Sequence, residues 1–405
     1  MVHKFLWVLF SFFLCSDLSA QNIPGKNFKW YKEPFLELEN GFIGPVMDEG
    51  YSYIVNNHKY GLIDFEGHLE VDTISAEPLY KKGLIPVKQG SNIGLINLKG
   101  DTVYPCKAYS FSFIKPDFYA LSVSGEILLF RGDGSRLKTA FPIRSIKGDA
   151  FKENALPVEV YLPNEKTAGG YIDPTGNSLT DFKYMYNTPF SGGIAGVMNP
   201  DNYKWSIIDK KGNTVFACPD NWTSVNSFDG PLALINIKDA KGFAFIDRNF
   251  KIVVEPQFSA YRQRHNGLYV VSKEGDYGAI DSTGKVIIPF EFNEFNEYTI
   301  DKLIVSKFFF KTQYDDLAKL WAYENTYLKY GVFDLTKKAI SIPLEYEDLQ
   351  SAGNGLLIAR SNGKYGYLNE QGKPLSEIVF EKAGPFYKKR AWVKFNGKWG
   401  IIEMR

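Results

Sequence analysis

Short hydrophobic segments alternate with polar turns along almost the whole length of this chain of 405 residues. The clearest example lies between Gly267 and Phe292, where residues 268–271 (Leu-Tyr-Val-Val), 277–281 and 286–289 are largely hydrophobic. Gly, Asp, Ser, Thr and Pro mark the turns between them. Hydrophobic runs this short, rich in β-branched and aromatic residues and bounded by turn formers, are typical of strands and hairpins. The pattern therefore predicts an all-β fold.

One short phrase recurs ten times along the chain. It consists of an aromatic or apolar residue, a small residue, two hydrophobic residues and usually Asp or Asn, as in residues 60–64 (Tyr-Gly-Leu-Ile-Asp). The small-residue position marks the copies, which fall at Gly61, Gly94, Leu128, Gly170, Ser206, Ala244, Gly278, Gly331, Gly366 and Gly400. Seven of the nine intervals are 33–38 residues long. A period of this size indicates supersecondary units that stack because none buries a core alone.

An Asp-x-x-Gly turn follows several copies of the phrase. It is found at Asp64/Gly67, Asp173/Gly176, Asp209/Gly212 and Asp281/Gly284, and Asn replaces Asp at Asn97/Gly100 and Asn369/Gly372. The side-chain oxygen is expected to accept backbone N–H groups two or three residues on, while Gly supplies the positive φ that closes the turn. Because Asn serves as well as Asp, we interpret these carboxylates as structural, not catalytic or calcium-binding.

Four of these copies carry a Lys-aromatic-Gly triplet: Lys59-Tyr60-Gly61, Lys329-Tyr330-Gly331, Lys364-Tyr365-Gly366 and Lys398-Trp399-Gly400. The triplets, the Ile-Asp-x-x-Gly turn and the Ile-Ile-Pro segment that follows resemble the repeats of the WG-repeat proteins of bacteria. The resemblance covers essentially the whole chain after its first twenty residues, although Ile127-Leu128-Leu129-Phe130 lacks the Gly. It implies an all-β repeat domain with a binding role, and it supplies no catalytic residues to transfer.

The two ends of the chain hold complementary fragments of one unit. Residues 31–35 resemble residues 253–258, the later half of a unit, whereas the C-terminus stops after the earlier half at Glu403. Joining the two fragments would complete a unit, as in β-propellers, where closure removes exposed strand edges. We therefore predict a closed, β-propeller-like ring of about ten β-hairpin or meander units. Two smaller rings, or an open β superhelical stack, are the alternatives.

The first twenty residues predict a signal peptide, with Lys4 before a short apolar run and a small-residue exit at Ala20. Residues 21–405 then form the repeat domain, and we expect it to be secreted or periplasmic. The alternative is a lipid anchor through Cys15. We interpret Cys106 and Cys218 as buried hydrophobic residues, because equivalent positions in non-adjacent repeats lie too far apart for a disulfide.

Variation between copies concentrates in one turn of the unit. Residues 308–328 form an insertion there, and residues 162–169 form a smaller expansion at the same phase. The insertion contains Tyr314, Trp321, Tyr323 and Tyr327, and Asp315-Asp316 is a candidate start for a short helix. Equivalent loops of stacked repeats share a face, often the binding face. We predict that these four aromatic residues bind a ligand; the alternative is that they pack the insertion onto the scaffold.

Composition narrows the choice of function. The balance of 47 basic and 46 acidic residues gives no basic surface for nucleic acid, and the four histidines supply metal sites poorly. No nucleophile, zinc-protease or phosphate-loop motif is present. We expect a monomeric, non-catalytic binding or scaffold protein without cofactors or a membrane span, which holds a protein or glycan ligand at the cell envelope. The alternative is an extracellular polysaccharide hydrolase that uses paired carboxylates.

Overall fold

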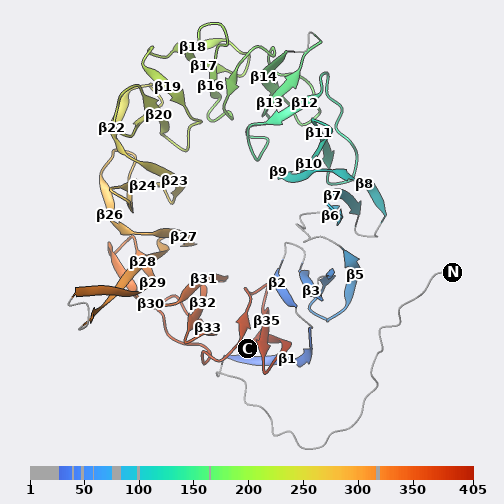
Figure 1. Cartoon of the computed structure of the whole chain (residues 1–405), viewed down its shortest axis with the longest axis vertical. Helices are drawn as coiled ribbons and strands as arrows, with labels where there is room; N and C mark the ends of the chain where they lie inside the picture. The colour runs from blue at the N-terminus through green and yellow to red at the C-terminus, as the bar shows by residue number, and fades with distance from the viewer. Residues whose placement is uncertain are drawn as a thin grey trace, which may run out of the picture.

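The described part of the chain is a ring built only of β-structure (Figure 1). The computed structural model describes residues 27–38, 41–46, 50–57, 59–74, 84–97, 101–163, 166–315 and 320–405. Within these ranges, 36 strands form nine sheets and no residue is helical. The predicted closed β-propeller is confirmed, so the open stack and the pair of smaller rings are excluded. The predicted signal peptide and Cys15 lie outside the described residues.

Consecutive antiparallel strands make up each sheet, and in β23–β26 and β27–β30 the first strand lies nearest the centre of the ring (Figure 1). The first half of the ring contains β2 (Phe42–Val46), β3 (Ser52–Asn56), β4 (Lys59–Ile63) and β5 (Leu69–Ile74); β6 (Leu84–Gln89), β7 (Asn92–Asn97) and β8 (Thr102–Ala108); the six strands β9 (Ser110–Ile114), β10 (Phe118–Val123), β11 (Glu126–Arg131), β12 (Ile143–Ile146), β13 (Leu156–Tyr161) and β14 (Thr167–Ile172); and β15 (Tyr186–Asn187), β16 (Ile194–Met198), β17 (Trp205–Asp209) and β18 (Thr214–Ala217).

The second half of the ring returns to the beginning of the chain. It contains β19 (Trp222–Val225), β20 (Ala233–Ile237), β21 (Phe243–Ile246) and β22 (Ile252–Phe258); β23 (Ala260–His265), β24 (Leu268–Lys273), β25 (Asp276–Ile280) and β26 (Val286–Phe292); β27 (Glu294–Thr299), β28 (Lys302–Asp315), β29 (Leu320–Asp334) and β30 (Ala339–Tyr346); β31 (Asp348–Gly353), β32 (Leu356–Ser361) and β33 (Lys364–Leu368); and β34 (Lys382–Ala383), β35 (Arg390–Phe395) and β36 (Lys398–Met404), which pairs with β1 (Phe28–Leu36).

Pairing of the first strand with the last closes the ring. Strand β1 pairs antiparallel with β36, with Phe28 opposite Met404 and Trp30 opposite Ile402. The sheet order is β1-β36-β35-β34, so the N-terminal strand supplies the outermost strand of the C-terminal sheet. The closure predicted from the two end fragments is therefore confirmed. It gives β36 a partner on both sides, which removes the free edge that the C-terminal half-unit would otherwise expose.

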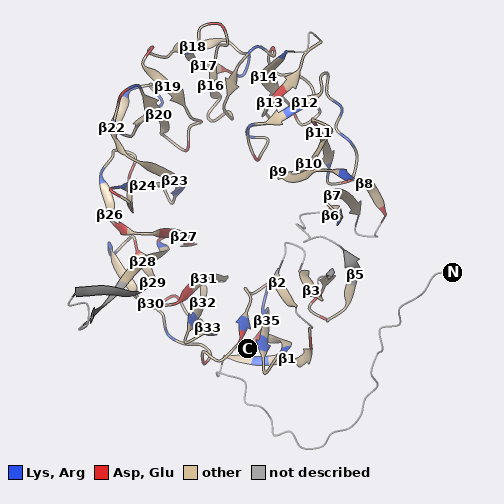
Figure 2. Ribbon diagram, in the orientation of Figure 1, with Lys and Arg blue, Asp and Glu red and all other residues tan. Residues whose placement is uncertain are grey.

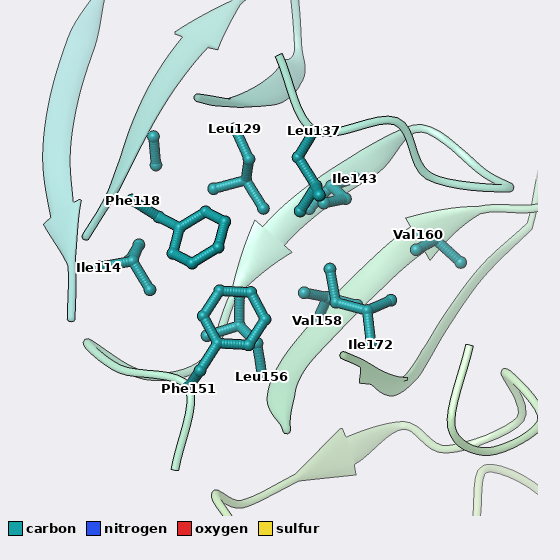
Figure 3. Packing of buried hydrophobic residues seen from close by; sticks show 11 residues of the cluster. Ile114, Phe118, Leu129, Leu137, Ile143, Phe151, Leu156, Val158, Val160 and Ile172 are labelled. Carbon is teal, nitrogen blue, oxygen red and sulfur yellow. The ribbon is translucent and has the colours of Figure 1, made fainter. Parts of the chain in front are cut away.

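The ten copies of the phrase form nine sheets, because the copies marked by Leu128 and Gly170 share one sheet of six strands. Strand β12 pairs with β11 through Ile127 and Ile143 and with β13 on its other side, so it joins the two copies. One core also spans both halves: Phe118 and Leu129 lie in the same buried cluster as Leu156 and Val158 (Figure 3). The predicted ring of about ten units therefore has nine sheets.

The unit predicted from residues 267–292 is confirmed as strands β24, β25 and β26. The structure adds an inner strand, β23, whose residues include Arg262, Gln263 and Arg264 and therefore show no hydrophobic run. Hydrophobic cores form between neighbouring sheets: Tyr269 is fully buried and belongs to a cluster with residues of β20–β22. This shared burial is the physical reason that single units do not stand alone.

The Asp-x-x-Gly turns within the described residues form as predicted; Gly100, of the predicted Asn97/Gly100 turn, lies outside them. Asp281 Oδ1 accepts the N–H groups of Thr283 at 2.8 Å and Lys285 at 3.1 Å, and Gly284 has φ = +86°. Asn369 Oδ1 accepts the N–H groups of two residues in the same way, at 3.0 and 2.8 Å. The amide oxygen thus replaces the carboxylate oxygen without changing the geometry. Hydrogen bonds from Thr283, first from its side chain and then from its backbone, outweigh burial and lower the pKa of Asp281.

A side chain one or two residues after the turn Asp or Asn links each of several sheets to the preceding one in the ring; it is one residue on at Lys210, Arg248 and Glu370, and two residues on at Glu66. Arg390 Nη1 lies 3.0 Å from Glu66 Oε1, Lys302 Nζ lies 2.9 Å from Glu370 Oε2, and Lys210 Nζ lies 3.1 Å from Glu153 Oε2. Arg248 donates to the carbonyl oxygen of Ser191 at 2.6 Å. The charge of these turn residues differs from sheet to sheet, and in each of these four contacts the partner belongs to the sheet before it; Arg248 also donates to the Gly230 carbonyl, between β19 and β20 of its own sheet, at 2.7 Å. Inter-sheet polar contacts therefore supplement the shared hydrophobic cores.

The two cysteines of the described residues have free thiols. Cys218 is buried, as predicted, and burial raises the pKa of its thiol to about 12. Cys106 is only half-buried, so the prediction of a fully buried residue is wrong there. The two side chains belong to different sheets, on β8 and beside β18.

Candidate functional site

The insertion at residues 308–328 is an elongated hairpin, not a loop. Strands β28 and β29 run for 14 and 15 residues and pair from Lys302 opposite Asp334 to Asp315 opposite Leu320. Asp315 and Trp321 lie on strands, so the predicted short helix is wrong at both residues; residues 316–319 lie outside the described part of the chain. The aromatic and β-branched residues on both strands favour this extended pairing over a helical turn.

Strand pairing places the four predicted ligand-binding residues along this hairpin. Tyr314 pairs with Trp321, Tyr323 with Thr312, and Tyr327 with Phe309. The side chains of Tyr314, Trp321 and Tyr323 lie outside the described part of the structure.

The fourth of these residues, Tyr327, has a described side chain. Its ring stacks on that of Phe309 at a centroid distance of 6.0 Å, and the Lys329 ammonium lies 5.8 Å from its centroid. The side chain is 43% exposed. Tyr327 thus packs against a neighbour within the hairpin and still presents a surface to solvent.

A cleft of about 400 Å³ lies between the six-stranded sheet and the sheet β15–β18. We call it the interblade cleft and define it by its lining residues: Arg144, Lys147, Glu159, Thr167, Ala168, Lys183, Tyr184, Met185, Tyr186, Pro200 and Tyr203. Between β14 and β15 the chain forms only isolated bridges, Ile172 with Ser178 and Gly169 with Tyr184. The cleft therefore lies where the outer strand of the six-stranded sheet is interrupted.

Three cations and one carboxylate set the charge of the interblade cleft. Arg144 Nη1 donates to both carboxylate oxygens of Glu159, each at 2.8 Å, and Ser145 Oγ donates to Oε2 at 2.9 Å. Lys147 Nζ lies 3.8 Å from Glu159 Oε2. Figure 2 shows the resulting blue and red segments side by side on β12 and β13.

These partners keep Glu159 ionised. Burial by itself would raise the pKa of the carboxyl group, but the hydrogen bonds from Ser145 and Thr167 and the neighbouring Arg144 together lower it. The Glu159 side chain is 13% exposed, whereas that of Arg144 is 48% exposed. The guanidinium therefore retains solvent-facing donors after binding Glu159, and the lining carries an excess of two positive charges.

Two exposed tyrosines form the opposite wall of the interblade cleft. The Tyr186 ring is stacked on the Trp205 indole at a centroid distance of 6.4 Å and an interplanar angle of 17°. Trp205 is buried and donates its Nε1–H to the Thr223 carbonyl at 3.0 Å. The indole that supports the Tyr186 ring is therefore fixed. Tyr186 is 48% exposed and Tyr203 is 65% exposed.

The backbone holds Tyr203 in an unusual conformation. Its φ is +58°, a region that bulky residues rarely adopt and that costs roughly 1–3 kcal/mol. The Tyr203 N–H donates to the Asn199 carbonyl and the Asn199 N–H to the Lys204 carbonyl, each at 3.0 Å. Asp201 N–H also donates to Asn199 Oδ1, at 2.8 Å. The turn thus fixes the backbone of an exposed tyrosine in a strained conformation.

Tyr184 lines both the interblade cleft and a second cavity of about 330 Å³, whose lining includes Asn199, Gly212 and Thr214. Only 7% of this tyrosine is exposed, and its hydroxyl has no hydrogen-bond partner in the described structure. Burial, followed by the charges of Asp181 and Asp209, raises the pKa of the hydroxyl. A buried hydroxyl without a partner is a polar group left available to a ligand or water.

The chain also matches a known family. The family model "WG containing repeat" matches five segments: residues 170–204, 243–275, 277–307, 330–365 and 365–399. This chain is a WG-repeat protein. The resemblance of its Lys-aromatic-Gly triplets is thereby confirmed. No curated protein matches the sequence.

Solved structures similar to this WG-repeat protein include a eukaryotic initiation factor, at 12% identity and TM-score 0.42, covering 77% of this chain and 88% of the other. Apo AztD from Citrobacter koseri matches at 13% identity and TM-score 0.37, covering 74% of this chain and 93% of the other. The WD40 domain of SCAP from fission yeast matches at 9% identity and TM-score 0.29, covering 93% of this chain and 98% of the other. Similarities this low carry no argument about ligand or activity.

The WG-repeat pattern covers only one wall of the interblade cleft. Tyr186 and Tyr203 lie within the first matched segment, residues 170–204, whereas Arg144, Lys147 and Glu159 precede it. Sequence reasoning missed all five residues. The sequence feature that pointed to this cleft was the expansion at residues 162–169, because Thr167 and Ala168 line the cleft.

The described ranges contain no group of three or more His, Cys, Asp and Glu side chains placed to hold a metal ion. They also contain no helix with the length and apolar character needed to cross a bilayer.

Proposed function

We propose that this WG-repeat protein is a non-catalytic binding or scaffold protein that holds a protein or glycan ligand at the edge of its β-propeller. The observation that supports this proposal is the interblade cleft, where exposed tyrosines and cations converge on a hydrogen-bonded scaffold. Ligand sites are usually concave, with a few polar groups among apolar ones, and volumes of roughly 300–1,000 Å³ are typical. The cleft has this size, and charged and aromatic side chains dominate its lining.

The geometry favours binding over polysaccharide hydrolysis. Hydrolysis of a glycosidic bond requires two carboxyl groups across the bond, and one of them must be a protonated acid with a raised pKa. Glu159 is the one carboxylate in the lining of the interblade cleft, and its partners lower its pKa. An ionised carboxylate that already accepts hydrogen bonds from Arg144 and Ser145 is suited to holding a guanidinium in place.

We place the protein outside the cytoplasm, secreted or periplasmic, on the basis of the hydrophobic N-terminal segment. Fractionation of cells that express the full chain, with N-terminal sequencing of the exported form, tests this placement. Release that begins at Gln21 is the expected result. Retention of the protein in the membrane fraction, lost in Cys15→Ser, would show the lipid-anchored alternative.

Glycan-array binding and pull-down by the full chain test the proposed function. We expect ligand capture that falls in Tyr203→Ala and persists in Tyr109→Ala, since both tyrosines are 65% exposed but only Tyr203 lines the cleft. Trp321→Ala tests the hairpin in the same assay. Capture that survives Tyr203→Ala and fails in Trp321→Ala would assign binding to the hairpin. Turnover of a polysaccharide, lost on changing a pair of carboxylates, would contradict the non-catalytic proposal.

A further inference from the structure

We propose that the interblade cleft binds an acidic saccharide, a sugar chain that carries carboxylate groups. This inference rests on the proposed binding function and specifies its ligand. It uses both walls of the cleft: the cations Arg144, Lys147 and Lys183, and the tyrosines Tyr186 and Tyr203.

The cationic residues supply the charge selectivity. Arg144 and Lys147 share a single carboxylate, Glu159, so two cations face one anion. Lys183 is paired with Asp181 at 3.6 Å, but both side chains are largely exposed, at 55% and 84%. An ion pair this exposed is weak, so a ligand carboxylate competes with it easily. The cleft therefore offers donors to an incoming anion while its own carboxylate remains occupied.

The aromatic wall supplies the selectivity for a sugar. One side of a pyranose ring presents C–H groups, whose partial positive charge is attracted by the negative face of an aromatic ring. Tyr186 is supported by the buried Trp205 and is half exposed, and Tyr203 is held at a positive φ in a hydrogen-bonded turn. Rigid aromatic side chains lose little conformational entropy on binding. The Tyr186 ring is therefore preorganised for a flat, partly apolar ligand, and Tyr203 adds a second exposed ring on a backbone that the turn fixes.

The two walls together match one ligand chemistry. An acidic sugar unit carries an apolar face and a carboxylate on the same small ring, and it fits a cleft of about 400 Å³. A neutral sugar would use the tyrosines and leave the excess cations without a partner.

Calorimetric titration of the purified full chain tests the proposal. The ligands are galacturonic acid oligosaccharides and galactose oligosaccharides of the same length, which differ in the carboxylate. We expect the acidic oligosaccharide to bind more tightly and the binding to weaken with added salt. Lys147→Gln/Lys183→Gln is expected to weaken acidic binding about tenfold, because each exposed charge contact contributes modestly. Tyr203→Ala is expected to weaken it at least as much.

Matched controls exclude general effects on charge or folding. Lys307→Gln/Lys398→Gln removes two cations of similar exposure, 36% and 51% against 35% and 55%, from outside the cleft. Tyr109→Ala removes an equally exposed tyrosine. Both variants should bind like the unmodified chain, and circular dichroism should show the same fold in all variants.

Other outcomes overturn the proposal in distinguishable ways. Equal affinity for the two oligosaccharides, unchanged by Lys147→Gln/Lys183→Gln, would refute acid selectivity and leave the proposed binding function intact. Acidic binding that survives every cleft variant would refute this site. Binding of neither oligosaccharide, with capture of a protein that persists in Tyr203→Ala, would refute the saccharide and leave the binding function. Absence of any saccharide or protein ligand would overturn both proposals.

Discussion

At the scale of single residues, the turn carboxylates and the cleft tyrosine differ in how well the sequence predicts them. The Asp-x-x-Gly spacing predicted the turn at Asp281 because all of its hydrogen bonds are local. The conformation of Tyr203 was not predictable, because its positive φ contradicts the preference of its own side chain and depends on the surrounding turn. The sequence does not predict the contact of Arg144 with Glu159 either, since this contact depends on a register shift between β12 and β13.

Replacement of a turn carboxylate should destabilise the fold, whereas replacement by the amide should not. Asp281→Ala removes the acceptor of two backbone N–H groups, at an expected cost of about 1–2 kcal/mol. Asp281→Asn keeps the acceptor and should change stability by less than about 0.5 kcal/mol. Urea unfolding followed by tryptophan fluorescence measures both values. Equal stability of the two variants would contradict the structural role of the turn.

The turn aspartates should also make stability fall in acid. The pKa values of Asp173, Asp209, Asp247 and Asp281 are lowered in the fold, and that of Asp334 is lowered to about 2, chiefly by the hydrogen bond from Thr336. Because a lowered pKa means that the folded state binds protons more weakly, their stabilisation is complete above about pH 4 and is lost as pH falls towards 2. The melting temperature should therefore drop across this range. A flat profile would contradict the assignment.

At the scale of elements, the ring depends on the junction between its first and last sheets. Arg390, on β35, lies 3.3 Å from Glu403 and 3.0 Å from Glu66, and its guanidinium lies 3.3 Å from the Tyr31 ring centroid. These partners belong to β36, to the turn after β4 and to β1. One side chain thus contacts the N-terminal strand, the C-terminal sheet and the first sheet of the ring.

Removal of this side chain should loosen the closure. Arg390→Ala is expected to cost about 1–2 kcal/mol, because charge-assisted hydrogen bonds and a cation–π contact are lost together. Arg262→Ala is the matched control: its guanidinium lies 4.1 Å from the Tyr277 centroid, but both residues belong to one sheet. Hydrogen exchange in β1 should rise only in Arg390→Ala. The same increase in both variants would show that Arg390 does not act at the junction.

At the scale of the whole molecule, the repeat pattern determined most of the architecture and little of the candidate site. The period of the phrase and the complementary ends predicted a closed ring, because stacking and edge pairing follow from the pattern itself. The pattern did not show that ten copies form nine sheets, since the copies marked by Leu128 and Gly170 merge through β12. The interblade cleft adjoins this merged sheet, so the site lies where the repeat departs most from its own pattern.

Joining the ends of the described chain should preserve the fold. The Arg405 N–H donates to the Asn27 carbonyl at 3.1 Å, so a short Gly linker spans the junction. A circular permutant with new ends in the exposed turn at Gly275 should fold with stability within about 2 kcal/mol of the original. Deletion of residues 27–36, in contrast, should expose the edge of β36 and cause aggregation in light scattering. A soluble deletion variant of full stability would contradict closure by β1.

Hydrogen–deuterium exchange of the full chain, with and without the galacturonic acid oligosaccharide, tests the central claim about function most directly. Occupation of the interblade cleft predicts slower exchange in residues 143–147, 183–187 and 199–205, with no change in β28 and β29. Protection confined to the β28–β29 hairpin, or absent throughout the ring at saturating oligosaccharide, would contradict the assignment of the cleft as the ligand site.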